Sequence, residues 1–393
     1  MSEWQEVRLG TIVASVSETF KFTDKQVVFL NTSDILADKF LHADLSDPKK
    51  LPGQAKKRIK KGDLLFSEIR PANKRYALVN FDADDYVVST KLMVLRSKGN
   101  IDPTYLKLFL TSEETLDYLQ MIAEDRSGTF PQITFDILDR MELMVPPLPE
   151  QKAIASVLSS LDDKIDLLHR QNTTLERMAE TLFRQWFVED AQEDWEEKPL
   201  DKLVTITSSK RVFYSEYVTS GVPFYRSKEI IELHNSGSTN SELFITESRF
   251  NEINDKFGAP QESDILLTSV GTLGIPYKVK KSDRFYFKDG NLTWFKDFTG
   301  VPSVIIYCWL KSNIGKEQLD SITIGSTQAA LTISGLKQIV FKLPPKDVIK
   351  MAEEKLTAVY SKIEGNQKQI FTLEKLRDNL LPKLMSGEIR VEH

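Results

Sequence analysis

Residues 154–186 read IASVLSSLDDKIDLLHRQNTTLERMAETLFRQW, and this stretch decides the fold. Its apolar or small residues recur at steps of four and three, which is the heptad pattern of a helix that packs on another helix. One polar residue, Asn172, interrupts the pattern. A helix from Glu150 to Phe187 would be about 57 Å long at 1.5 Å per residue. The residues that form this seam are Ile154, Leu158, Leu161, Ile165, Leu168, Leu175, Ala179, Leu182 and Trp186.

A second heptad seam runs through residues 352–384, with polar breaks at Asn366 and Arg377. An amphipathic helix on the surface of its own module is the alternative, but heptads sustained this long exceed the usual globular helix. Antiparallel pairing of the two helices would bring Asn366 opposite Asn172, with apolar pairs on either side. A buried Asn pair costs stability but fixes the register, so we predict that Asn172 and Asn366 set it. The apolar residues of this seam are Ala352, Leu356, Val359, Ile363, Ile370, Leu373, Leu380 and Leu384.

The chain contains an internal repeat. Residues 127–134, SGTFPQIT, align with residues 325–332, GSTQAALT, and the same offset continues without a gap through Pro146-Pro147 and Pro344-Pro345 into both seams. Earlier segments match at slightly different offsets, as loop insertions would cause. Such self-similarity predicts two copies of one structural unit. We therefore place globular modules at 1–145 and 189–343, and long helices at 146–188 and 344–393.

Each module shows short β-rich segments separated by Gly, Asn and Asp. In the first module these are residues 63–67, 86–89 and 92–95, and residues 105–121 have helical spacing. In the second module they are residues 265–268, 277–279 and 292–295. The predicted fold class is α+β, with two pseudo-symmetric globular domains joined by two long helices that form an antiparallel coiled coil.

Composition excludes several classes of protein. The chain has 393 residues, a single cysteine and no apolar run long enough for a membrane span, so we expect a cytoplasmic protein. Cys308 lies in an apolar run and is expected in the core. The net charge of −5 is unusual for a DNA-binding protein. Seven basic residues and no acidic one nevertheless lie between Pro48 and Gly62, although a solvated loop is an equally good interpretation of that run.

Several motifs carry a family resemblance. Residues 146–152, PPLPEQK, followed by 162–165, DDKI, and 182–187, LFRQWF, resemble the central helical region of type I restriction–modification specificity subunits. Residues 376–389, LRDNLLPKLMSGEI, resemble their C-terminal region. The resemblance covers the whole chain, but the globular modules match only in outline.

The resemblance implies a function and a set of partners. The two modules would be target-recognition domains that read the halves of an asymmetric, bipartite double-stranded DNA target. The long helices would be spacers that dock modification subunits, two of them, and restriction subunits join the complex. The chain would be non-catalytic and hold no metal or cofactor, with S-adenosylmethionine, ATP and Mg on the partner subunits.

Candidate DNA contacts are Arg and Asn, which bind base edges, and Lys, which neutralises phosphates. For each side chain, a solvated or ion-paired role is an even alternative. In the first module the candidates are Arg70, Asn73, Lys74, Arg75 and Gln132 for bases or backbone, and Lys56, Lys57, Arg58, Lys60 and Lys61 for phosphates. In the second module they are Lys210, Arg211, Arg226, Lys228, Ser269, Thr272, Lys278 and Gln328.

Other functions remain open at this point. An enzyme is disfavoured, because the sequence has no Asn-Pro-Pro-Tyr methyltransferase motif, no Walker A loop and no His spacing typical of a metal site. A coiled-coil interaction scaffold that never touches DNA needs only the helices. A specificity subunit of a related methylation-based defence system would share all of the features above.

Overall fold

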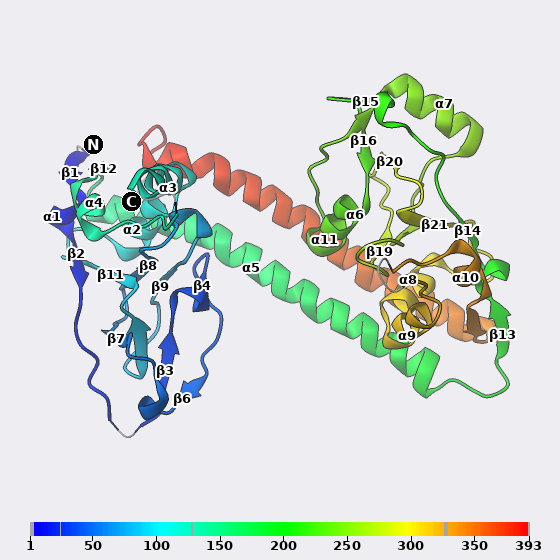
Figure 1. Ribbon diagram of the computed structural model, residues 1–393, viewed down its shortest axis with the longest axis horizontal. Coiled ribbons are helices and arrows are strands. Elements are labelled where there is room, and N and C mark those ends of the chain that lie inside the picture. Colours follow the sequence, from blue (N-terminus) through cyan, green and yellow to red (C-terminus); the bar gives the residue numbers. More distant parts are fainter. Residues whose placement is uncertain (1–3, 24, 127–128, 326–328, 392–393) are drawn as a thin grey trace. The chain divides into compact units, whose positions relative to one another are not determined.

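The computed structural model describes residues 4–23, 25–126, 129–325 and 329–391. The chain forms two compact units, Met1–Ile165 with Thr372–His393 (unit 1), and Asp166–Phe371 (unit 2). Both boundaries between the units fall inside long helices, so each unit contains one globular module and part of each long helix. Figure 1 shows the chain coloured along its sequence.

Unit 1 is built on two four-stranded sheets. The first has the order β2-β11-β8-β9 and is antiparallel. The second has the order β6-β3-β10-β7, in which β3 and β10 run parallel. A two-stranded sheet, β1-β12, adjoins the start of the long helix. The elements are β1(Gln5–Arg8), α1(Leu9–Ile12), β2(Val13–Val16), β3(Val27–Leu30), β4(Ile35–Leu36), β5(Lys39–Phe40), β6(Leu45–Ser46), β7(Ala55–Arg58), β8(Leu64–Ser67), β9(Tyr76–Leu78), β10(Tyr86–Ser89), β11(Leu92–Ser97), α2(Pro103–Leu110), α3(Glu113–Arg126), α4(Phe135–Arg140) and β12(Glu142–Val145).

Unit 2 repeats this plan. Its first sheet, β14-β21-β18-β19, has the same connections as β2-β11-β8-β9, and its parallel pair β16-β20 corresponds to β3-β10. Along the chain of unit 2, helices α6 and α7 are inserted between β16 and β18. The elements are β13(Glu196–Pro199), β14(Thr205–Thr207), β15(Tyr217–Val218), β16(Val222–Tyr225), α6(Ser227–Ser236), β17(Phe244–Ile245), α7(Glu247–Phe257), β18(Ile265–Thr268), β19(Pro276–Lys278), β20(Tyr286–Phe287), β21(Leu292–Lys296), α8(Ser303–Lys311), α9(Asn313–Ser321), α10(Ile333–Gln338) and β22(Val340–Leu343).

The helical segment predicted at residues 105–121 is two helices, α2 and α3. The break falls at Thr111 and Ser112, where the Ser112 hydroxyl donates to Phe109 O at 3.0 Å and accepts from Thr115 N at 3.3 Å. Ser competes with the helix backbone for hydrogen bonds, which explains why the chain turns here. The α+β class and the duplication are confirmed.

The two long helices are α5(Leu148–Arg184), which continues into a π-helical turn at Gln185–Glu189, and α11(Lys346–Met385). In unit 2, Asn366 Nδ2 donates to Asn172 Oδ1 at 2.8 Å. Lys311 then reaches both Glu176, at 3.5 Å, and the ring of Tyr360, at 5.9 Å. Residue numbers thus rise along α5 as they fall along α11, so the two segments are antiparallel.

The same direction holds in unit 1. Arg377 Nη1 lies 3.0 Å from Asp162 Oδ1, and Arg390, just beyond α11, pairs with the buried Glu150 near the start of α5. Pro382 lacks the backbone donor of a helical residue, and a proline often ends or bends a helix. The helix continues past this proline to Met385, so Pro382 lies in its last turn.

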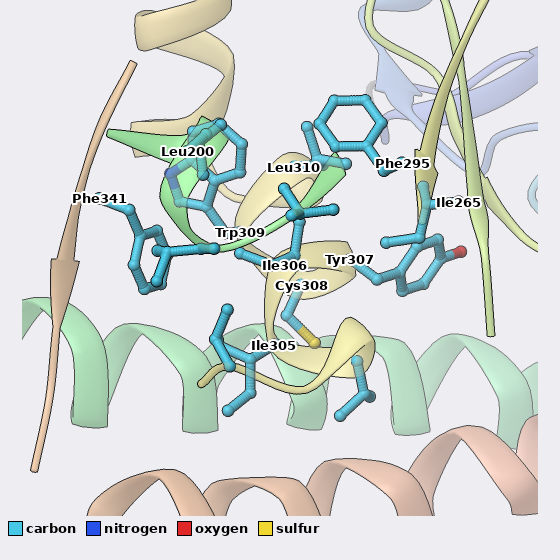
Figure 2. Packing of buried hydrophobic residues seen from close by; sticks show 14 of the residues in the cluster. Leu200, Ile265, Phe295, Ile305, Ile306, Tyr307, Cys308, Trp309, Leu310 and Phe341 are labelled. Atoms are coloured by element: carbon cyan, nitrogen blue, oxygen red, sulfur yellow. The ribbon is translucent and has the colours of Figure 1, made fainter. Parts of the chain in front are cut away.

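The module of unit 2 is anchored to its long helices by helix α8. Figure 2 shows Ile305 and Cys308 pointing from α8 toward the long helices beneath it, while Trp309 and Leu310 point toward the module. Cys308 is buried, as predicted, and burial raises the pKa of its thiol to about 12. One continuous core therefore joins the module to the segments of α5 and α11 that belong to unit 2.

Candidate nucleic-acid interface

Two candidate segments of unit 1 meet in the structure. The loop between β8 and β9, residues 68–75, lies against residues 131–133. Arg70 N donates to Pro131 O at 3.1 Å, and Ile133 N donates to Glu68 O at 2.8 Å. An isolated bridge joins Ile69 to Gln132. Arg70 and Gln132, which the sequence singled out separately, therefore belong to one composite loop.

Unit 2 contains the same composite loop. The loop between β18 and β19, residues 269–275, is joined to the segment 329–331 by a bridge from Val270 to Ala330. Leu331 N donates to Ser269 O at 3.0 Å. The sequence did not predict this pairing, although both segments belong to the stretches that repeat between the two halves.

The composite loop of unit 1 presents polar side chains from a fixed backbone. Arg70 and Lys74 have left-handed φ values of 43° and 54°, and the short helix Pro71–Asn73 lies between them. Such conformations persist in non-glycine residues only where surrounding contacts hold them. One contact is the hydrogen bond from Ala72 N to Gln120 Oε1 on α3, at 3.1 Å. The exposed side chains of Arg70, Asn73 and Lys74 have no hydrogen-bond partner within the described part of unit 1.

Arg75 supports the backbone beside the composite loop. Its Nη1 donates to Ser33 O at 2.9 Å and to Ile35 O at 3.0 Å. These two hydrogen bonds to backbone carbonyls hold the neighbouring chain in place, and the guanidinium has further N–H donors on its other nitrogens. Arg75 therefore supports the loop, and its contact with DNA stays a prediction.

The basic residues between Pro48 and Gly62 likewise fall into two groups, those with a partner inside unit 1 and those without one. Lys57 Nζ donates to Leu92 O at 2.8 Å, and burial lowers the pKa of this amine, so it is engaged within the module and its role as a phosphate contact stays a prediction. Arg58 pairs with Asp84 at 2.7 Å, and Lys60 pairs with Glu18 at 3.2 Å. The run is partly strand β7 rather than a solvated loop throughout. Among the described residues Lys56 and Lys61 have no ion-pair partner and are exposed.

The candidate cations of unit 2 are largely neutralised by acids. Arg226 contacts the buried Glu229 at 2.8 Å and Glu242 at 3.1 Å, and Lys228 contacts Glu242 at 2.7 Å. The two carboxylates raise the pKa of the Arg226 guanidinium. This network of ion pairs fixes the start of α6. Arg226 therefore stabilises the fold of unit 2, whether or not it also contacts DNA.

The polar candidates of the unit 2 loop differ in exposure. Ser269 is only 3% exposed, and its hydroxyl lies 2.6 Å from Thr293 Oγ1, so the hydroxyl is engaged within the module and a DNA contact stays a prediction. Thr272 is exposed next to Gly271, whose φ of 81° is natural only for glycine. Lys278 on β19 is half-buried. Gln328 lies outside the described residues.

Two remaining candidates lie on the connection from β14 to β15. Arg211 Nε donates to Asp289 Oδ2 at 2.9 Å, but the Arg211 side chain remains mostly exposed. Lys210 Nζ stands 4.5 Å from the centre of the Phe257 ring. No group of three potential metal ligands and no helix apolar and long enough to cross a bilayer occurs in the described part of the chain.

These features define a protein with two versions of one module, each presenting a composite loop, on paired long helices. Comparisons with known proteins identify the family. The family described as type I restriction modification DNA specificity domain matches residues 1–177 and 192–375. The chain belongs to this family, and the resemblance seen in the sequence is confirmed.

Individual relatives agree. The chain is 32% identical over 477 aligned positions, 99% of its length and 100% of the relative, to the type I restriction enzyme HindI specificity subunit of Haemophilus influenzae. It is 28% identical, over 75% of its length and 71% of the relative, to the MjaIX specificity subunit of Methanocaldococcus jannaschii. The fold matches the crystal structure of a type I S subunit from M. genitalium with a TM-score of 0.66 at 15% identity, over 98% and 96% of the two chains.

Proposed function

We propose that this chain reads an asymmetric, two-part DNA target and carries that address to partner enzymes. The observation that supports this most strongly is the composite loop, which recurs in both units on the same backbone plan with different side chains. Unit 1 presents Arg70, Asn73 and Lys74, whereas unit 2 presents Thr272. Two readers built alike but with different donors recognise two different half-sites.

The chain acts as a non-catalytic subunit in the cytoplasm. Two modification subunits dock on it and methylate adenine with S-adenosylmethionine, and restriction subunits that use ATP and Mg join the complex. The relatives named above are specificity subunits of type I restriction enzymes, which supports this assignment of partners.

The charge balance supports joint binding with the partners. The net charge is −5, and Arg226, Lys228 and Arg58 are paired with acids. Strong binding therefore requires the additional basic surface of the complex. The isolated chain should bind DNA weakly and lose affinity steeply with salt, because phosphate contacts release counterions. Tight, salt-insensitive binding by the isolated chain would contradict this.

The test is a methylome. The chain is co-expressed with its modification subunit in a host that lacks methylation, and N6-methyladenine is mapped across the genome. We expect one gapped, asymmetric motif methylated in both halves. No methylation, with a modification subunit that is active beside another specificity subunit, would favour a scaffold that never reads DNA.

A further inference from the structure

Unit 1 carries an exposed aromatic side chain that the proposed composite loop does not use. Phe22 is 43% exposed, and its ring lies 5.0 Å from the ring of Phe20, which is buried. Phe22, Thr23, Pro48 and Lys49 line an open hollow of about 420 Å³. We call residues 20–23, 25 and 48–56 the unit 1 tip. It lies at the end of the β6-β3-β10-β7 sheet away from α5 (Figure 1).

The unit 1 tip is firmly attached to the sheet behind it. Phe20 N donates to Lys56 O at 2.7 Å, and Thr19 forms a bridge with Lys57. Phe20 packs in a small core with Val27, Ala55 and Val87. The exposed ring of Phe22 is therefore attached to a backbone that is held to the sheet by hydrogen bonds and by a small core.

The charge of the unit 1 tip is strongly positive. Residues 20–25 and 48–56 contain five lysines and one acid, Asp24. Within the residues that the structure describes, none of these lysines has an ion-pair partner, in contrast to Lys60 and Arg58 nearby. Unpaired lysines around an exposed aromatic ring suit a nucleic acid, because the lysines can neutralise phosphates while the ring stacks on a base. The five are Lys21, Lys25, Lys49, Lys50 and Lys56.

Unit 2 has a corresponding element, which we call the unit 2 tip, residues 208–216. It follows β14 as the unit 1 tip segment 20–25 follows β2, and it leads to the parallel strand β16 as that segment leads to β3. Phe213 is 60% and Tyr214 87% exposed, and Lys210 and Arg211 precede them. Phe213 N donates to Glu216 Oε2 at 2.7 Å, and Glu216 pairs with Arg249 at 2.7 Å, which fixes the turn.

We propose that the two tips are additional DNA-binding elements, in which Phe22 and the Phe213–Tyr214 pair stack on base faces while the adjacent cations contact phosphates. This inference rests on the proposed function, because it assumes that the duplex is the ligand. Side chains of this kind wedge between base steps and stabilise bases that have left the stack. Access to an adenine amino group inside a duplex requires such unstacking.

The test uses the full chain co-purified with its modification subunits, and a duplex that carries the methylated motif. Phe22→Ala, and separately Phe213→Ala with Tyr214→Ala, should weaken binding on the order of tenfold, as loss of one base–aromatic stack does. Phe22→Trp should retain affinity, whereas Phe22→Leu should not, because only a ring stacks. Met144→Ala, which removes an exposed apolar side chain elsewhere on unit 1, is the matched control and should have no effect.

A second readout separates the ring from the lysines. Lys49→Ala with Lys50→Ala should reduce the slope of log affinity against log salt by about 0.9 for each phosphate that is no longer neutralised, whereas Phe22→Ala should leave the slope unchanged. Unchanged affinity in both aromatic variants would overturn the inference. So would a loss of DNA binding that only follows loss of co-purified modification subunits, since the rings would then dock a protein. If the wild-type complex itself ignores the motif, the proposed function fails as well.

Discussion

Asn366 donates its side-chain amide to Asn172 at 2.8 Å, between apolar positions of the helix seam. Leu168 and Ile370, the next seam residues on one side of the pair, are both buried, and so is Asn366. The other amide oxygen of the pair, Asn366 Oδ1, is buried without a hydrogen bond in the described structure. The pair therefore sacrifices stability, and we attribute its presence to the register of the helices.

Replacing both asparagines with leucine should stabilise the chain by about 1–2 kcal/mol, because an imperfectly satisfied polar pair becomes apolar. Asn366→Leu alone should be less favourable than the double variant, since it leaves Asn172 without its partner. Urea unfolding measures both effects. The register role predicts that the double variant methylates motifs with more than one spacer length. A single unchanged spacer and an unchanged unfolding midpoint would contradict it.

Arg70 and Arg75 stand on the same loop and should behave in opposite ways. Arg75→Ala removes hydrogen bonds to Ser33 O and Ile35 O and should destabilise unit 1 by about 2 kcal/mol, since bonds from charged donors are the stronger ones. Arg70→Ala should leave thermal unfolding unchanged. Differential scanning calorimetry of the two variants makes the comparison. Equal destabilisation by both substitutions would contradict the proposal that Arg75 stabilises the loop while Arg70 contacts DNA.

Two equivalent carboxylates, Asp63 and Asp264, should also respond differently. Asp63 is 1% exposed and accepts two hydrogen bonds from Arg96, at 2.7 and 2.8 Å. Asp264 instead accepts from Trp294 Nε1 at 2.8 Å and Gln261 N at 2.9 Å. Asp63→Asn should cost about 2 kcal/mol because it weakens a charged pair. Asp264→Asn keeps an acceptor for both neutral donors.

The pH dependence of the Asp264→Asn variant follows from the same contacts. Burial raises the pKa of the Asp264 carboxyl above its unfolded value. A raised carboxyl pKa means that the folded state binds the proton more tightly, so its contribution to stability is present in acid and lost as pH rises through the folded pKa. Asp264→Asn should therefore stabilise the chain at neutral pH, with the gain vanishing in acid. Unfolding measured from pH 4 to 8 would contradict this if the gain were independent of pH.

The sequence predicts the parts of the molecule that depend on local patterns. The heptad seams predict α5, α11 and the Asn172–Asn366 contact, because positions on a helix face follow from residue spacing alone. The internal repeat predicts two similar modules. The strands β8 and β18 follow from short β-rich runs that recur in both halves.

The sequence could not predict contacts between distant segments. The bridge from Ile69 to Gln132 joins residues whose proximity depends on the packing of α3 and the sheet between them. Arg70 and Arg75 are the same residue type on one loop, and only the neighbouring carbonyls decide which of them is free. Ser269 reads as a polar loop residue, but the register of β18 against β21 places its hydroxyl beside Thr293.

The most direct test of the account is a methylome of a variant altered in one loop only, Arg70→Ala with Asn73→Ala. The account predicts that one half of the recognised motif becomes degenerate, while the other half and the spacer are unchanged, because unit 2 reads its half-site independently. Degeneracy in both halves, or an unaltered motif with normal methylation, would contradict the claim that each composite loop reads its own half of the target.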